Sequence, residues 1–197
     1  MRIRFMASMI ATGSVIALSG CGVGTGAPSE PAQLNPTQAA SPIPAVENPR
    51  DVSALARRPC ELLTSQQAAG FGLDLPPKQY DAALGDLGCK WTSTMQDRRI
   101  FRTVRIDTFT NNPTLEVAYS KRRVLPFFEL TEIAGYPALV SRTNADLPIC
   151  DIDVKPAERQ SVSVAYESKE FNNNPQQSCE VGKQVAAAVL MNLPPKS

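Results

Sequence analysis

The chain has 197 residues, with five cysteines, no histidine and a formal net charge of +1. Without histidine it cannot form a Ser-His-Asp triad, use an imidazole as general base, or build a zinc site with histidine ligands. The length suits one domain plus a non-globular segment, the hydrophobic content of 43 % is too low for several membrane spans, and the near-neutral charge does not suggest nucleic-acid binding.

The amino-terminal segment has the pattern of an export signal. A basic start at Arg2 and Arg4 precedes the uncharged, mostly apolar run 5–18, which is shorter than the roughly 20 residues of a membrane span. The closing sequence Leu18-Ser19-Gly20-Cys21 resembles the bacterial lipobox. This resemblance implies cleavage after Gly20, a diacylglycerol thioether on Cys21 and an acylated new amino terminus. We therefore expect residues 1–20 to be a lipoprotein signal peptide, the alternative being a simple signal peptide followed by a chance cysteine.

Residues 21–50 differ in composition from the rest of the chain. Six prolines alternate with small and polar residues, and no apolar periodicity is present. This composition predicts a disordered tether with a reach of about 30 Å as a random coil. A proline-rich partner motif is the alternative, but the segment contains no P-x-x-P array with flanking basic residues.

Residues 51–197 are expected to form one domain, which begins with a helix and two strands. The capping-box sequence 64–67 predicts a short helix that ends at Gly70 or Gly72. Alternating apolar residues over 88–95 predict a half-buried strand with Trp91 in the core. A turn at 96–98 leads into the returning strand 99–109, with Ile100 on its apolar face.

The sequence of the second half of the domain predicts a helix, four strands and a final helix. Asn112 followed by Pro113 is typical of a helix start and predicts a helix over 114–123 with Asn112 as N-cap. We expect strands near 126–133, 137–142, 149–154 and 161–167, and a last helix from an N-cap at Ser178 to Leu193. Short turns between strands favour antiparallel pairing over a parallel α/β sheet. The predicted fold class is α+β, an antiparallel sheet flanked by helices.

The four cysteines of the predicted domain indicate two disulfides, because an exported chain meets an oxidising environment. Of the three connectivities we favour the two sequence-local pairs, Cys60–Cys89 and Cys150–Cys179. A four-cysteine metal site is the alternative, but it lacks the close C-x-x-C spacing of structural zinc sites. We therefore predict no metal, no cofactor and no free thiol.

Two segments carry a family resemblance. The run Arg58-Pro59-Cys60-Glu61-Leu62-Leu63-Thr64 followed by Gly88-Cys89-Lys90-Trp91, with the lipobox and the proline-rich segment, resembles the actinobacterial lipoproteins grouped as domain of unknown function 3558. The run Gly135-Tyr136-Pro137-Ala138 and the later cysteine pair extend the likeness. The resemblance implies an envelope lipoprotein and suggests, by analogy, a PsbP/Mog1-like fold. It brings no established reaction, so only the five cysteines carry over, Cys21 for lipid and the other four for structure.

Few residues suggest chemistry. Asp151 and Asp153 share one face of a predicted strand, about 6.5–7 Å apart, and paired carboxylates suit hydrolysis or a hard cation. Charges alternating on a solvated strand face explain them equally well. The basic run 121–123 suits anionic headgroups or cell-wall phosphates, or is simply a solvated helix end. The composition of the polar loop 172–177 does not point to any particular ligand.

These observations favour a lipid-anchored, non-catalytic binding or interaction module on the extracytoplasmic face of the bacterial cell membrane. Its partner would be an unknown envelope protein or a small lipophilic ligand, and not nucleic acid. The alternatives are an envelope hydrolase using Asp151 and Asp153 and a purely structural accessory subunit. Catalysis is disfavoured because neither histidine nor a free thiol is expected.

Overall fold

The computed structural model describes residues 42–82, 86–94 and 100–197. The predicted signal peptide, the lipidation site Cys21, the tether up to residue 41 and the turn at 96–98 lie outside the described residues. The described chain belongs to one compact unit. None of the helices in that part of the chain is long and apolar enough to cross a membrane.

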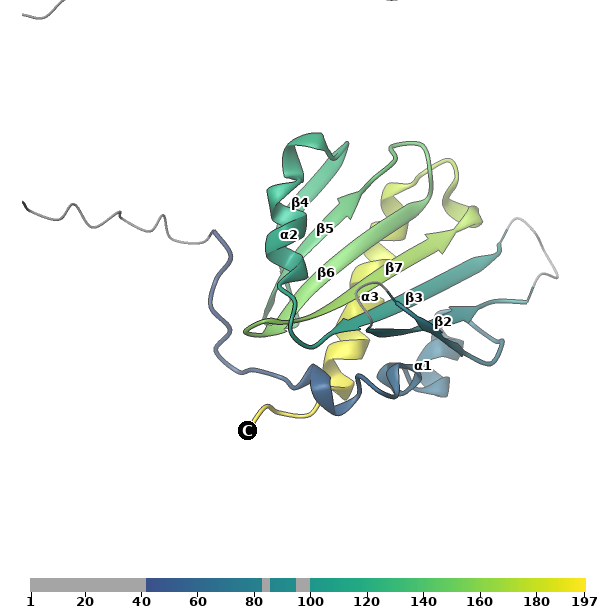
Figure 1. Ribbon diagram of the computed structural model, residues 1–197. Helices are drawn as coiled ribbons and strands as arrows, with labels where there is room; N and C mark the ends of the chain where they lie inside the picture. Colours follow the sequence, from purple (N-terminus) through teal and green to yellow (C-terminus); the bar gives the residue numbers. More distant parts are fainter. Residues whose placement is uncertain (1–41, 83–85, 95–99) are drawn as a thin grey trace, which may run out of the picture. The chain divides into compact units, whose positions relative to one another are not determined.

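The described strands form one antiparallel sheet, shown in Figure 1. They are β1 Lys78–Asp81, β2 Leu87–Thr92, β3 Arg102–Phe109, β4 Phe127–Ile133, β5 Tyr136–Arg142, β6 Ile149–Ala157 and β7 Gln160–Ser168, in the order β1-β2-β3-β7-β6-β5-β4. Strands β4 to β7 are consecutive neighbours, and β7 then pairs with β3. The connection from β3 to the far edge strand β4 must therefore cross one face of the sheet.

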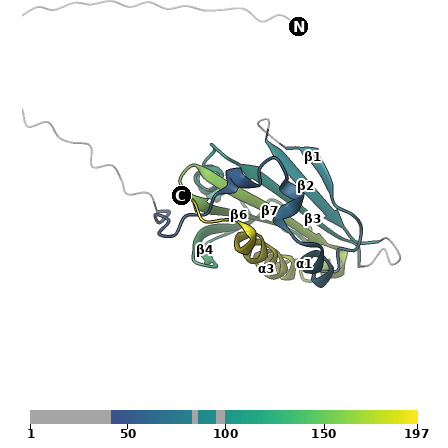
Figure 2. The same ribbon diagram turned by 90° about the horizontal axis from the view of Figure 1, so that it is seen from below.

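Helices cover both faces of the sheet. The α-helices are α1 Ser65–Gly70, α2 Thr114–Ser120 and α3 Gln176–Asn192, and short 3₁₀ turns are η1 Val52–Ala54, η2 Pro59–Leu62, η4 Arg122–Val124 and η5 Lys169–Phe171. Figure 1 shows α2 in front of the sheet and α3 behind it, and Figure 2 shows α1 beside α3. Helix α2 lies in the crossing connection, so the topology itself places it over β5, β6 and β7.

The main core lies between the sheet and α3. Alternate residues of the central strands, such as Trp91, Val104 and Ile152, are buried against Val185 and Val189 of α3. Trp91 is 1 % exposed, which confirms its predicted place in the core. A smaller cluster on the opposite face joins Leu115 of α2 to Leu139 of β5.

The predicted α+β class is confirmed, and local signals were reliable where both partners are close in sequence. Thr64 Oγ1 accepts a hydrogen bond from the Gln67 amide at 3.2 Å, and Gln67 Oε1 accepts one from the Thr64 amide at 2.8 Å, which is the predicted capping box. Gly72 follows the helix with φ of +72°, a conformation that favours glycine.

Three details of the prediction are wrong. Pro113, not Asn112, is the N-cap of α2, and the Thr114 amide instead donates to Ser161 Oγ at 3.2 Å. Ser178 lies inside α3, where its hydroxyl donates to the Pro148 carbonyl at 2.7 Å, a long-range partner that local sequence does not reveal. Ile100 precedes β3 and is 42 % exposed.

The end of one helix and the existence of one strand also differ from the prediction. The helix predicted over 114–123 ends at Ser120 and is followed by the η4 turn. The edge strand β1 was not predicted, because its sequence Lys-Gln-Tyr-Asp has no apolar alternation.

The folded part of the chain begins before residue 51. Ile43 is 5 % exposed and belongs to the small cluster with Leu115 and Leu139. Arg50 donates to the Tyr136 hydroxyl at 3.1 Å and to the Leu193 carbonyl at 3.0 Å. The predicted end of the tether at residue 50 is therefore too late, because one isoleucine in a polar segment gives no periodicity and yet fills an apolar site.

Candidate functional site

A pocket of about 390 Å³ lies between α2 and the face of the sheet that α2 crosses. Side chains of β3, β7 and β6 form its floor, and α2 with the segment after it forms a wall. Apolar side chains contribute carbon surface around a polar floor: Phe109, Val117, Ala118 and Leu125. The crossing connection thus creates both the helix and the cavity under it.

The strand register brings together charged residues that are far apart in the sequence. Ser163 of β7 lies between Asp107 of β3 and Asp153 of β6. In the adjacent row, Ala165 lies between Arg105 and Asp151. Three carboxylates therefore line one floor, with Asp107 separated from Asp153 by the width of β7.

The Asp153 side chain is half-buried in this floor, and its carboxyl group accepts a hydrogen bond from the Ser163 hydroxyl. Burial, with a smaller contribution from Asp151 and Asp107, raises its pKa to about 6, although Ser163 and Lys121 act in the opposite direction. Burial also raises the pKa of Asp151, helped by Asp107 and opposed by Arg105.

Asp151 and Asp153 do share one face of β6, as predicted. That face lines the pocket beside α2, and both side chains are half-buried there. Sequence reasoning missed Asp107, Arg105 and Ser163. The signal was present in β3, where Arg105 and Asp107 alternate with the buried Val104 and Ile106.

Asp107 has a second partner at the edge of the sheet. The Tyr80 hydroxyl of β1 donates a hydrogen bond to it, and burial together with Asp107 raises the pKa of Tyr80 well above its usual range. Gly88 lies between the two, and a Cβ there would come within 2.3 Å of Asp107 Oδ1 and 2.6 Å of Tyr80 Cζ. The glycine that precedes Cys89 thus leaves room for Tyr80 to reach Asp107.

We expect Gly88→Ala to lower the free energy of unfolding by about 1–3 kcal/mol, because the added methyl group displaces Tyr80 from Asp107. Tyr80→Phe should cost a comparable amount, and the double variant should cost less than the sum, since either change breaks the same hydrogen bond. Urea titration followed by circular dichroism measures all three. Gly70→Ala is the control: no atom lies within 4 Å of its Cβ, so it should be neutral or slightly stabilising. Additive losses would contradict the interpretation.

Asp153→Asn is expected to stabilise the protein at pH 7.5 by up to about 3 kcal/mol. A folded-state pKa of about 6, above the ordinary 3.8, means that the folded protein binds the proton more tightly than the unfolded chain. Wild-type stability should therefore gain from this group as the pH falls from about 6 towards 3.8, and the advantage of the variant should shrink over that interval. Unfolding titrations across this range test the prediction, with the exposed Asp146→Asn as control. A constant difference between variant and wild type would refute it.

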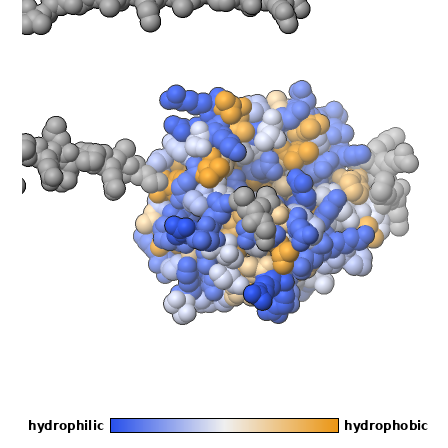
Figure 3. Space-filling view, in the orientation of Figure 1, coloured by the Kyte–Doolittle hydropathy of each residue, from blue (hydrophilic) through white to orange (hydrophobic). Residues whose placement is uncertain are grey.

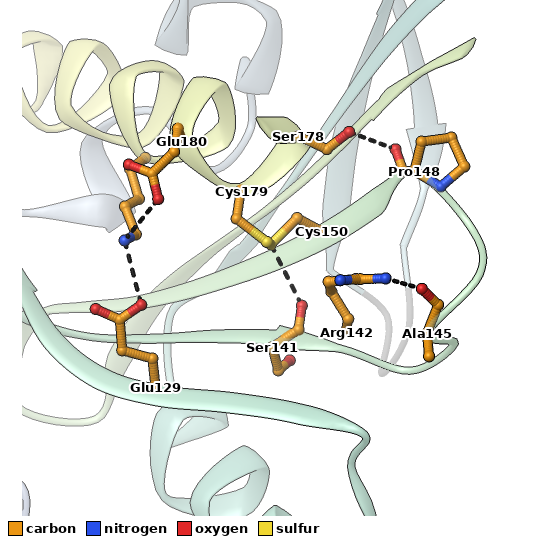
Figure 4. Close-up of a disulfide and its surroundings, with 10 residues drawn as sticks. Glu129, Ser141, Arg142, Ala145, Pro148, Cys150, Ser178, Cys179 and Glu180 are labelled. Atoms are coloured by element: carbon orange, nitrogen blue, oxygen red, sulfur yellow. Dashed lines mark hydrogen bonds and ion pairs between the residues drawn. A yellow bond between two sulfur atoms is a disulfide. The ribbon is translucent and has the colours of Figure 1, made fainter. Parts of the chain in front are cut away.

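The four domain cysteines form the two predicted disulfides. Cys60–Cys89 and Cys150–Cys179 have Cα–Cα distances of 5.1 and 5.0 Å. Figure 4 shows the second bridge between α3 and β6, with Cys150 Sγ 3.5 Å from the Ser141 carbonyl oxygen, a contact without a donated hydrogen because a disulfide sulfur carries none. The four-cysteine metal site is therefore wrong. Within the described residues no three carboxylate, thiolate or imidazole groups converge as metal ligands.

The other residues that the sequence suggested as functional do not lie together in the pocket. Lys121 lines the pocket, whereas Arg122 and Arg123 do not, and the loop 172–177 contributes nothing to it. Cys21 lies outside the described residues.

Comparison with the curated proteins and with the solved structures found no match. The PsbP/Mog1 analogy therefore stays a prediction. A sequence model of the family described as protein of unknown function (DUF3558) matches residues 16–192. The matched range contains both disulfides and every side chain of the pocket. The chain belongs to the DUF3558 family.

Proposed function

We propose that this protein is a lipid-anchored module on the extracytoplasmic face of the cell membrane, and that its pocket beneath α2 binds a small ligand with a positively charged nitrogen. The observation that carries the proposal is the half-buried side chain of Asp153 with its raised pKa, beside Asp151 on the pocket floor. The export and anchoring part rests on the lipobox at Cys21 and on the apolar run before it.

The electrostatics of the floor support a cationic ligand. Burying an ionised carboxylate costs several kcal/mol unless a cation or several donors compensate it. None of the six ion pairs among the described residues involves Asp107, Asp151 or Asp153. With a pKa of about 6, Asp153 is mostly ionised at neutral pH. Arg105 and Lys121 line the same pocket and offset part of the charge of the three carboxylates, and a ligand ammonium group would balance the rest.

The rest of the pocket suits a small amphiphilic molecule. Its volume of about 390 Å³ lies within the range typical of small-molecule sites, and Phe109, Val117 and Leu125 offer apolar contacts. At the start of α2, the buried hydroxyl of Thr114 has no hydrogen-bond partner in the described part of the chain and lines the same space. The absence of histidine from the sequence and the bonding of the four domain cysteines in disulfides favour binding over catalysis.

Binding of phenethylammonium tests the ligand class, with 2-phenylethanol as its neutral counterpart. Calorimetry should show saturable binding of the amine only. Asp153→Asn and Asp151→Asn should weaken it by about tenfold or more, whereas Asp146→Asn should leave it unchanged. Affinity should also fall as the pH drops below about 6, because Asp153 then becomes neutral. Equal binding of the alcohol, or unchanged affinity in both pocket variants, would refute the proposal.

The anchor is tested separately by the intact mass of protein extracted from membranes. We expect a mature chain that begins at Cys21 and carries added acyl mass, and release of Cys21→Ala from the membrane fraction. A chain that begins at Cys21 without acyl mass would disprove lipidation while leaving the pocket proposal standing.

A second candidate function is acid–base hydrolysis of a glycoside. The observation in its favour is the pairing of a carboxyl group of pKa about 6 with a second carboxyl group two residues along the same strand. The expected spacing of about 6.5–7 Å lies at the lower end of the range found in inverting glycosidases. Release of nitrophenol from aryl glycosides by the wild type, and its loss in both Asp→Asn variants, would establish hydrolysis. Equal release by all three proteins would exclude it.

A further inference from the structure

An exposed turn follows α2 at the edge of the pocket. We call residues 121–125, which are Lys121, Arg122, Arg123, Val124 and Leu125, the α2 tip. Val124 is 81 % exposed, more than any other exposed large hydrophobic residue in the described chain. In Figure 3 hydrophobic atoms appear between hydrophilic ones at this upper end of the molecule. An isolated apolar side chain is ordinary on a protein surface, but its setting among three consecutive cations is not.

The cations of the α2 tip are held in place without acidic partners. The Arg122 guanidinium lies 4.2 Å from the centre of the Tyr119 ring and donates to the Tyr119 carbonyl at 3.1 Å. Lys121 and Arg123 are exposed. None of the ion pairs among the described residues uses these three side chains, although Lys121 is close enough to Asp153 to lower the pKa of that group. Positive charge is therefore available at the surface around Val124.

We propose that the α2 tip rests on the surface of an anionic lipid bilayer, with Val124 inserted among the headgroups. Basic side chains attract anionic lipids, with about a fivefold gain in partitioning for each one near the surface, and an apolar side chain between them enters the interface. An extended anionic surface complements three adjacent cations that form no ion pair among the described residues. The positive charge of the α2 tip thus favours an anionic bilayer as the surface that it contacts.

The path of the chain agrees with this orientation. Ile43, next to the start of the described chain, packs in the cluster that contains Leu115 of α2. The first described residues therefore lie on the α2 side of the sheet. A random-coil tether of the predicted length would have a mean end-to-end distance of about 30 Å. The anchor supports the orientation, but binding of the α2 tip to lipid does not depend on it.

Tryptophan scanning on vesicles tests the contact. Residues 40–197 are used without an anchor, because they form a compact unit with its own core and both disulfides. Val124→Trp should show a blue-shifted emission with vesicles of equal parts phosphatidylglycerol and phosphatidylcholine, and none with phosphatidylcholine alone. The only native tryptophan, Trp91, is buried and provides the baseline. Met191→Trp, at a 70 % exposed position of α3 on the opposite face, is the matched control.

A charge variant keeps the test independent of the added tryptophan. Arg123→Glu should reduce co-sedimentation with the anionic vesicles by more than fivefold, whereas Lys169→Glu, at an exposed position of η5, should not. The proposal is overturned if Met191→Trp shifts as much as Val124→Trp, if Val124→Trp does not shift, or if Arg123→Glu binds like the wild type. A blue shift without vesicles that accompanies dimer formation would also overturn it, because a second copy would then cover the α2 tip. Arg123 and Val124 do not line the pocket, so failure here leaves the ligand proposal intact.

Discussion

Replacing Cys150 and Cys179 together by alanine is expected to lower the free energy of unfolding by about 4–5 kcal/mol, more than the same change at Cys60 and Cys89. Both bridges span 29 positions, so the chain-entropy model assigns each of them about 3.5 kcal/mol. Any difference between the two variants therefore reports the surroundings of the bridges and not their loop length.

The surroundings differ in burial. Cys150 and Cys179 are both fully buried where α3 meets β6, so loss of their sulfur atoms adds a small cavity to the core. Cys60 is only partly buried and connects the η2 turn to β2. We expect about 3.5 kcal/mol for that variant, measured by urea titration of both double-alanine proteins. Equal losses, or a larger loss at Cys60–Cys89, would show that the packing around the α3 bridge contributes nothing.

Trp91→Ala should cost about 3–5 kcal/mol, because the indole is the largest fully buried side chain and lies on β2 opposite Val104. Trp91→Phe keeps an aromatic ring and should cost less. Lys90→Ala, at the next position on the exposed side of the same strand, should change stability by less than about 0.5 kcal/mol.

Circular dichroism at increasing urea concentration is the appropriate measurement for this series, since the alanine variant has no tryptophan left to report unfolding. The prediction fails if Trp91→Ala and Lys90→Ala have similar midpoints. Such a result would mean that the core between the sheet and α3 closes around the missing ring without loss.

The topology of the sheet explains why a pocket forms here although the sequence contains no recognisable motif. Strand β4 forms the edge opposite β1, so the chain must pass across β7, β6 and β5 after leaving β3, and it does so through α2. A helix of this length covers only part of the face. The polar residues left beside it, including Asp107 and Asp153, form the floor of a cavity instead of an open surface.

The proposed ligand site would come at a cost in stability. Asp153→Asn is expected to make the protein more stable, so the ionised native carboxyl group does not favour folding at neutral pH. A carboxyl group with a pKa of about 6 is also sensitive to pH in the range of many bacterial surroundings, so ligand affinity should follow its ionisation.

Features that depend on neighbours along the chain follow from local sequence patterns. Alternation gave most of the strands, the Thr64–Gln67 capping box gave α1, and the spacing of the cysteines favoured the two observed bridges. Even the shared face of Asp151 and Asp153 followed from the two-residue period of a strand.

Features that depend on contacts between distant segments follow instead from the topology and packing of the sheet. Whether the aspartate face meets water or a helix is set by the β3-to-β4 crossing, and the meeting of Asp107 with Asp153 is set by the placement of β7 between β3 and β6. Likewise, Ile43 packs against Leu115 and Leu139, although the mostly polar residues around it in the sequence do not predict its burial. A local pattern specifies which side of an element is apolar, but burial, and with it the raised pKa of Asp153, arises from the elements that pack against it.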